Sequence, residues 1–138
     1  MPTSSAPPPL DIALPYYFAV QIQPREAAVL AVEAVCTTAK MMGILFRRVE
    51  VVGLINLGGR NFVRMRSDLA RASEVLTQLN SATNRGVMFP DGSSGMKVLL
   101  SNGRSGTVEG WKLHVMSSGA STMYRGPKIK NWERQFQN

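Results

Sequence analysis

The chain has 138 residues, of which 44% are hydrophobic, and this length favours one compact domain with tails over two domains. The formal net charge of +7 favours a polyanionic partner. A single cysteine, Cys36, excludes an internal disulfide and favours a reducing or organellar compartment. No run approaches the roughly 18 consecutive apolar residues of a membrane-spanning helix, so we expect a soluble protein without membrane contact.

Residues 1–15 are rich in proline and predict an extended N-terminal arm, because proline fixes φ and removes a hydrogen-bond donor. This arm lacks lysine and arginine and does not resemble a basic transit peptide or a secretory signal. The next run, "YYFAVQIQ" at residues 16–23, alternates apolar positions with the period of a half-buried strand.

Residues 25–43, "REAAVLAVEAVCTTAKMMG", predict the first helix. Val29, Val32, Cys36 and Ala39 recur at helical spacing and form its expected apolar stripe. A cysteine on such a stripe is far more often a core thiol than a nucleophile, so we interpret Cys36 as a core residue.

Two strand-like runs follow, "ILFRRVEVVGLIN" at residues 44–56 and "NFVRMRS" at residues 61–67. They predict either one long bent strand or a hairpin about Gly58 and Gly59. Alternation in the second run puts Phe62, Arg64 and Arg66 on one face and Val63 and Met65 on the other.

A second helix is expected in "LARASEVLTQL" at residues 69–79, with Ser67 and Asp68 as its N-cap. Residues 80–110 are rich in glycine, serine and asparagine and predict surface loops with a small hairpin. "WKLHVM" at residues 111–116 predicts a strand, and residues 121–138 form a basic, aromatic end to the chain.

The positive charge is concentrated in two segments. Residues 43–68 hold five basic and two acidic residues, and residues 97–138 hold seven basic and two acidic residues. Arginine at alternate ribbon positions offers bidentate donors to phosphates, whereas the plainer interpretation is a solvated strand face. Trp111, Tyr124 and Trp132 lie among the later basic residues and suit base stacking beside phosphate contacts, or the core. The predicted RNA-binding residues are Arg47, Arg48, Arg60, Arg64, Arg66, Lys112, Arg125, Lys128, Lys130 and Arg134.

The sequence offers little for catalysis. His114 is the single histidine, and it has no cysteine near it in sequence that would make a catalytic pair. We find no phosphate-binding loop, nucleophile elbow or metal-ligand cluster in the sequence. We therefore expect neither an enzyme nor a cofactor, metal or small-molecule substrate.

Three strings resemble a known family. "LPYYFAVQIQP" at residues 14–24 resembles the opening strand of the small ribosomal subunit protein six family of bacterial-type ribosomes. "AKMMGILFRRVEVVGLINLGGRNFVRMRS" at residues 39–67 is similar to that family's glycine turn and second strand, including its Asn-Leu-Gly-x-Arg pattern. "EGWKLHVMSS" at residues 109–118 resembles its third strand.

This resemblance implies an α+β ferredoxin-like sandwich, an antiparallel sheet with helices on one face, over residues 16–118. It implies binding to small-subunit rRNA, beside small ribosomal subunit protein eighteen and other ribosomal proteins. In this register residues 68–108 are a peripheral insertion and residues 119–138 a basic tail. These departures from the compact bacterial pattern suggest a member from the mitochondrial matrix.

One alternative belongs to a different functional class. A regulatory ligand-binding module of the ACT type has the same order of strands and helices if residues 69–79 are the true second helix. That interpretation predicts a homo-oligomer that purifies free of RNA, and it leaves the arginines unexplained.

Overall fold

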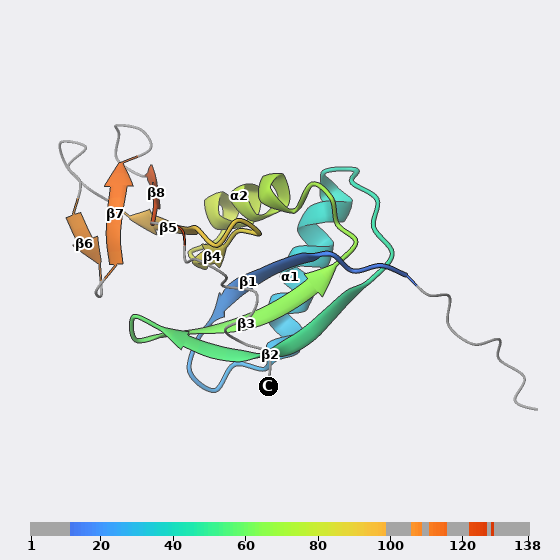
Figure 1. Ribbon diagram of the computed structural model, residues 1–138, viewed down its shortest axis with the longest axis horizontal. Helices are drawn as coiled ribbons and strands as arrows, with labels where there is room; N and C mark the ends of the chain where they lie inside the picture. Colours follow the sequence, from blue (N-terminus) through green and yellow to red (C-terminus); the bar gives the residue numbers. More distant parts are fainter. Residues whose placement is uncertain (1–11, 99–105, 109–110, 116–121, 127, 129–138) are drawn as a thin grey trace, which may run out of the picture.

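The structure is a computed structural model that describes residues 12–98, 106–108, 111–115, 122–126 and 128 (Figure 1). Helices and strands follow one another within these residues as β1 (Tyr16–Ile22), α1 (Ala28–Met41), β2 (Val49–Leu57), β3 (Arg60–Ser67), α2 (Ala72–Ala82), β4 (Val87–Met88), β5 (Ser94–Val98), β6 (Gly106–Val108), β7 (Trp111–Val115) and β8 (Thr122–Arg125).

The first six elements run strand, helix, strand, strand, helix, strand, and their four strands lie side by side in the order β2-β3-β1-β4. This is the ferredoxin-like arrangement. The strands pair antiparallel, and α1 and α2 pack against each other on the same face of the sheet (Figure 1). The protein is therefore an α+β ferredoxin-like sandwich, as predicted.

The sheet continues beyond this core. Strand β5 pairs with β4, and β8, β7 and β6 follow toward the end of the sheet opposite β2 (Figure 1). Neither α1 nor α2, the helices of the described residues, is long and apolar enough to cross a membrane.

The main core lies between the sheet and the two helices. Strand β1 contributes Phe18, Val20 and Ile22 to it, as the alternating pattern predicted. Helix α1 buries Ala31, Val35 and Ala39, whereas Val29 on the predicted stripe is 56% exposed. Two of the four predicted stripe positions, Val32 and Cys36, are half-buried. The apolar face is thus rotated from the predicted one, since its fully buried residues are Ala31, Val35 and Ala39.

Strands β2 and β3 form a hairpin, which decides between the two predicted alternatives. Gly58 and Gly59 have φ values of 58° and 82°, and the register closes on the pair Leu57 and Arg60. Positive φ at both turn residues is the geometry of a two-residue type I′ turn, which glycine adopts without strain.

Strand β2 is the outer strand at its end of the sheet. Its register with β3 shifts between Val51 and Gly53, so Val52 is an extra residue at a β-bulge. Side chains along this strand remain accessible, with Leu54 68% exposed and Val51 49% exposed. The helix layer therefore leaves the outer part of the sheet uncovered.

The prediction that residues 68–108 are a peripheral insertion is wrong for α2 and β4. Helix α2 buries Val75, Leu76 and Leu79 completely and packs beside α1. Strand β4 pairs with β1 in the centre of the sheet. The register taken from the resemblance has to change, because the third strand is β3 and not residues 109–118.

Candidate nucleic-acid interface

The middle of the β2–β3 hairpin buries an arginine that was predicted to contact RNA. Arg64 has no exposed surface, and its guanidinium lies over the ring of Tyr17, 4.6 Å from the ring centroid. Ala19, Phe62 and Met88, on the same face of the sheet, are also fully buried. The sheet face opposite the helices is therefore not open here, and Arg64 is not available to a phosphate.

One end of the hairpin, the base, holds two arginines that share a carboxylate. Glu50 accepts hydrogen bonds from Arg48 at 3.2 Å and from Arg66 at 3.0 Å. The bond from Arg66 lowers the pKa of Glu50 most, and Arg48 contributes less. The side chains of Arg48 and Arg66 are 39% and 44% exposed. Two exposed guanidinium groups thus compete for one negative charge.

Arg47 lies at the same end, where Asp68 fixes the start of β2. The carboxylate of Asp68 accepts the backbone N–H groups of Arg47 and Arg48 at 2.9 to 3.0 Å. Burial raises the pKa of Asp68, but these hydrogen bonds lower it by more, so the pKa lies below its usual value. The predicted N-cap role of Asp68 is wrong, because α2 begins at Ala72 and the carboxylate faces the hairpin.

The other end of the hairpin, the tip, holds Arg60. Its guanidinium donates to Oε1 of Gln21 at 3.3 Å, and the same oxygen accepts the backbone N–H of Gly86 at 2.9 Å. Arg60 is half-buried. This arginine therefore helps to join β3 to β1, and a part of it remains accessible.

The C-terminal candidates gather around the turn between β4 and β5. Arg125 stacks over the ring of Phe89, 3.7 Å from its centroid, donates to Ser93 Oγ, and lies 3.7 Å from Asp91. Lys128 is 3.8 Å from Asp91 and is 71% exposed. Most of Arg125 is therefore used inside the protein, whereas Lys128 is presented to solvent.

The remaining predicted residues fall outside what the structure describes. Lys130 and Arg134 lie beyond the described residues, and Lys112 is placed through the backbone of β7 alone. The same holds for His114, which pairs through its backbone with Arg125.

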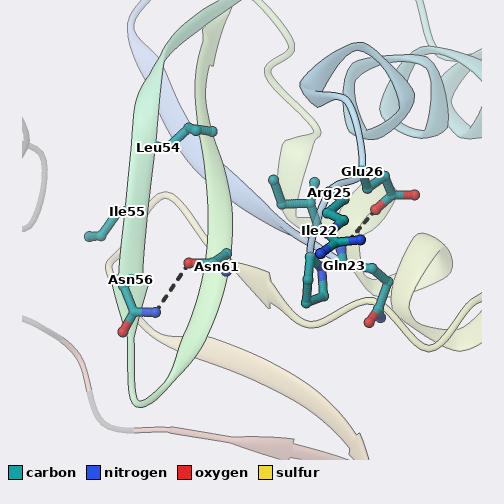
Figure 2. A pocket seen from close by; sticks show the side chains of 9 residues that line it. Ile22, Gln23, Arg25, Glu26, Leu54, Ile55, Asn56 and Asn61 are labelled. Atoms are coloured by element: carbon teal, nitrogen blue, oxygen red, sulfur yellow. Dashed lines mark hydrogen bonds between the residues drawn. The ribbon is translucent and has the colours of Figure 1, made fainter.

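A pocket of about 360 Å³ lies at the hairpin tip, between the hairpin and the turn from β1 to α1 (Figure 2). The hairpin wall consists of Leu54, Ile55, Asn56 and Asn61, and the turn contributes Ile22, Gln23, Pro24, Arg25 and Glu26. Asn56 Nδ2 donates to Asn61 Oδ1 at 3.1 Å, across the hairpin. Sequence reasoning missed this pocket, because its two walls are about 30 residues apart along the chain.

Arg25, on the rim of this pocket, has a left-handed backbone with φ of 68°. For a residue other than glycine, asparagine or aspartate this conformation costs roughly 1 kcal/mol. No described residue forms a hydrogen bond or an ion pair with the guanidinium of Arg25. The pocket therefore has one uncompensated positive charge.

The neighbouring Glu26 is neutralised by Arg85. Arg85 donates to both oxygens of Glu26, at 2.8 and 2.7 Å, and to the backbone oxygen of Gln21 at 2.9 Å. The side chains of this pair are 20% and 17% exposed. The hydrogen bond from Arg85 is the main cause that lowers the pKa of Glu26. The pair ties the loop before β4 to the turn before α1.

The described residues offer little for metal or thiol chemistry. Within them, no group of three or more histidine, cysteine, aspartate and glutamate side chains is close enough to hold a metal ion. Cys36 is half-buried on α1, and burial raises the pKa of its thiol. A raised pKa lowers the thiolate fraction at neutral pH, which agrees with a packing role for this residue.

Comparison of the chain with models of known protein families, with curated proteins and with solved structures finds no match.

Proposed function

We propose that the protein is a structural component of the small subunit of a mitochondrial, bacterial-type ribosome, where it binds rRNA and neighbouring ribosomal proteins. The observation that carries this proposal is the surplus of exposed guanidinium groups at the base of the β2–β3 hairpin. Arg48 and Arg66 share the single carboxylate of Glu50. A phosphate backbone is the partner that suits such repeated positive charge on an extended surface.

The corrected register supports the same proposal. The resemblance at residues 14–24 and 39–67 falls on β1, on the end of α1 and on the β2–β3 hairpin. The second helix and fourth strand of a ferredoxin-like domain then follow directly as α2 and β4. The departure from the compact bacterial pattern is then not an insertion before the third strand, but the extension of the sheet beyond β4 by β5, β8, β7 and β6.

Sedimentation tests the proposal directly. An epitope-tagged copy of the full chain, followed through a sucrose gradient of an organelle lysate at modest salt, is expected in the small-subunit fractions. High salt is expected to release part of it, since each phosphate contact contributes to the salt dependence of binding. Recovery in the low-molecular-weight fractions alone, at modest salt, would contradict the ribosomal assignment.

The ACT-like regulatory module remains the second candidate, and one observation favours it. Helix α2 packs centrally beside α1, which that alternative requires. The same order of elements also fits a ribosomal protein of the resembled family, so topology does not separate the two. The surplus of positive charge from Arg48 and Arg66 around Glu50 supports the ribosomal protein, because repeated guanidinium groups suit phosphates. A homo-oligomer that purifies free of RNA would favour the regulatory module.

A further inference from the structure

We propose that the pocket at the hairpin tip holds one unpaired nucleotide of an RNA strand, with its phosphate at Arg25 and its base against Asn56 and Asn61. This inference rests on the proposed RNA-binding function and adds a specific subsite to it. The pocket lies on the helix side of the sheet, beyond the start of α1, and Figure 2 shows Leu54 directed toward it and Ile55 directed away.

The two asparagines supply the polar contacts that a base requires. Asn56 Nδ2 is already used in its hydrogen bond to Asn61 Oδ1. Asn56 Oδ1 remains as an acceptor and Asn61 Nδ2 as a donor, and both side chains are exposed to the pocket. An adjacent acceptor and donor match the alternating groups on the edge of an unpaired nucleobase.

Apolar surface completes the subsite. Leu54 is 68% exposed, and Pro24 and Ile22 line the opposite side. A volume of about 360 Å³ lies in the range of small-molecule subsites, which combine mostly apolar walls with a few polar groups. A base packed between Leu54 and Pro24 would remove this apolar surface from water.

The positive charge of Arg25 favours an anionic ligand in this pocket. Glu26 is held in a bidentate pair by Arg85, so it does not neutralise Arg25. Arg25 keeps its left-handed backbone although, among the described residues, no hydrogen bond or ion pair of its guanidinium offsets the strain. Strain retained at the rim of a pocket is typical of a binding role. A guanidinium binds a phosphate, as it does a carboxylate, with two parallel hydrogen bonds, and phosphate is the anion that an RNA strand carries.

Two ligands carry both a base and a phosphate: an RNA strand and a free mononucleotide. The surplus charge at the hairpin base lies some six residues of β3 away from the tip, roughly 20 Å. It also lies on the other face of the sheet, because Arg66 shares the face of Arg64 whereas the pocket lies on the helix side. An RNA strand that passes around the outer strand β2 would contact both sets of arginines, whereas a mononucleotide would occupy the pocket alone. We therefore assign the subsite to RNA and use the mononucleotide as a competitor.

The test uses the full chain and a fluorescein-labelled single-stranded RNA of about ten nucleotides that contains 4-thiouridine. Fluorescence anisotropy at several salt concentrations gives the affinity and its salt dependence. Arg25→Gly is expected to weaken binding about tenfold at low salt and to reduce the log-log salt slope by about 0.7. Photo-crosslinks are expected on residues 22–26 or 54–61.

Matched controls separate the subsite from general charge. Lys40→Gln removes one exposed positive charge near the other end of α1 and is expected to change affinity much less than Arg25→Gly. Asn61→Asp adds a negative charge inside the pocket, and Asn84→Asp adds one on an exposed bend outside it. Only Asn61→Asp is expected to weaken binding strongly. Thermal denaturation confirms that each variant is folded.

The outcomes distinguish this inference from the proposed function. Equal losses for Arg25→Gly and Lys40→Gln, with crosslinks outside the pocket, would overturn the subsite even if the protein still sediments with the small subunit. Full competition by a free mononucleotide at equal concentration would overturn the RNA strand as occupant and favour the regulatory module. Arg25-dependent RNA binding without co-sedimentation would uphold the subsite and contradict the ribosomal assignment.

Discussion

The middle and the ends of the β2–β3 hairpin use arginine in opposite ways. In the middle, Arg64 is fully buried over the ring of Tyr17. At the base, Arg48 and Arg66 are substantially exposed and share Glu50. At the tip, Arg25 on the facing turn has no partner within the described residues. The number of arginines on a ribbon therefore does not give the number available to a ligand.

Burial of an arginine on this hairpin depends on how much apolar surface its neighbouring side chains place around it. Phe62 and Met88 are buried on the same face of the sheet as Arg64, so its guanidinium lies in a closed layer with an aromatic ring beneath it. At the base of the hairpin, Arg48 and Arg66 bind the carboxylate of Glu50 and keep a large part of their side chains in water.

The largest effect is expected for Arg64→Ala. Removal of a fully buried side chain leaves a cavity and an aromatic ring without its cation, so the free energy of unfolding should fall by about 2–4 kcal/mol. Urea denaturation measures the loss. Arg66→Ala, on the same strand and face, should cost far less because that side chain is exposed. Equal costs would mean that Arg64 is not part of the core.

Glu26→Gln is expected to have the next largest effect, with a clear pH dependence. Arg85 lowers the pKa of Glu26 below its ordinary 4.5, so the pair stabilises the fold above this pH and the contribution is lost as the pH falls through the folded pKa. The variant should be less stable by about 1–3 kcal/mol at neutral pH.

The difference between wild type and Glu26→Gln should close as the pH falls well below 4.5. Unfolding by urea between neutral and acidic pH measures it. Glu33→Gln, on the exposed side of α1, serves as the control with the same change in charge. A difference that persists unchanged in acid would show that Glu26 acts through packing and not through its charge.

A smaller effect is expected at the base of the hairpin. Glu50→Gln removes the carboxylate that Arg48 and Arg66 share, which should tighten RNA binding about twofold to fivefold at low salt. Glu74→Gln makes the same change in net charge and releases Arg71 at the N-cap of α2, away from the hairpin. Anisotropy with labelled RNA compares them. Equal tightening by both variants would assign the effect to net charge alone.

The smallest effect concerns the backbone at the tip. Glycine adopts a positive φ without strain, but it also increases the entropy of the unfolded chain. Arg25→Gly should therefore leave the free energy of unfolding within about 1 kcal/mol of wild type, while Arg25→Ala, which keeps the strain, should be the less stable of the two. Thermal denaturation ranks them. An Arg25→Gly variant less stable than Arg25→Ala would show that the side chain supports the fold.

Local pattern was enough to predict β1 and α1 as elements and to offer the β2–β3 hairpin as one of two alternatives. The alternation of Phe18, Val20 and Ile22 gave the correct buried face, and Gly58 and Gly59 marked the turn as one of two alternatives. These features depend on residues close together in sequence. Helix α2 was also predicted as an element, but its predicted place in the fold, outside the core, was wrong.

The errors have a common physical origin. Strand β4 has two residues, Val87 and Met88, too few for a periodic signal, although its pairing with β1 closes the core. Alternation put Arg64 and Phe62 on the correct face, but it does not reveal that this face is buried. The pocket and the Glu26–Arg85 pair join segments distant in sequence. Arg85 stands alone in a polar loop, where no local signal marks it as a partner.

The bulge at Val52 has a consequence for how the protein behaves at high concentration. Among the described residues, no strand pairs with the outer edge of β2, and such an edge with exposed Val51 and Leu54 is a template for edge-to-edge aggregation. The extra residue interrupts the regular spacing of backbone donors and acceptors, so an incoming strand cannot pair in one register along the whole of β2. The shift between Val51 and Gly53 is thus expected to keep the accessible edge from seeding fibrils, without a charged side chain at that point.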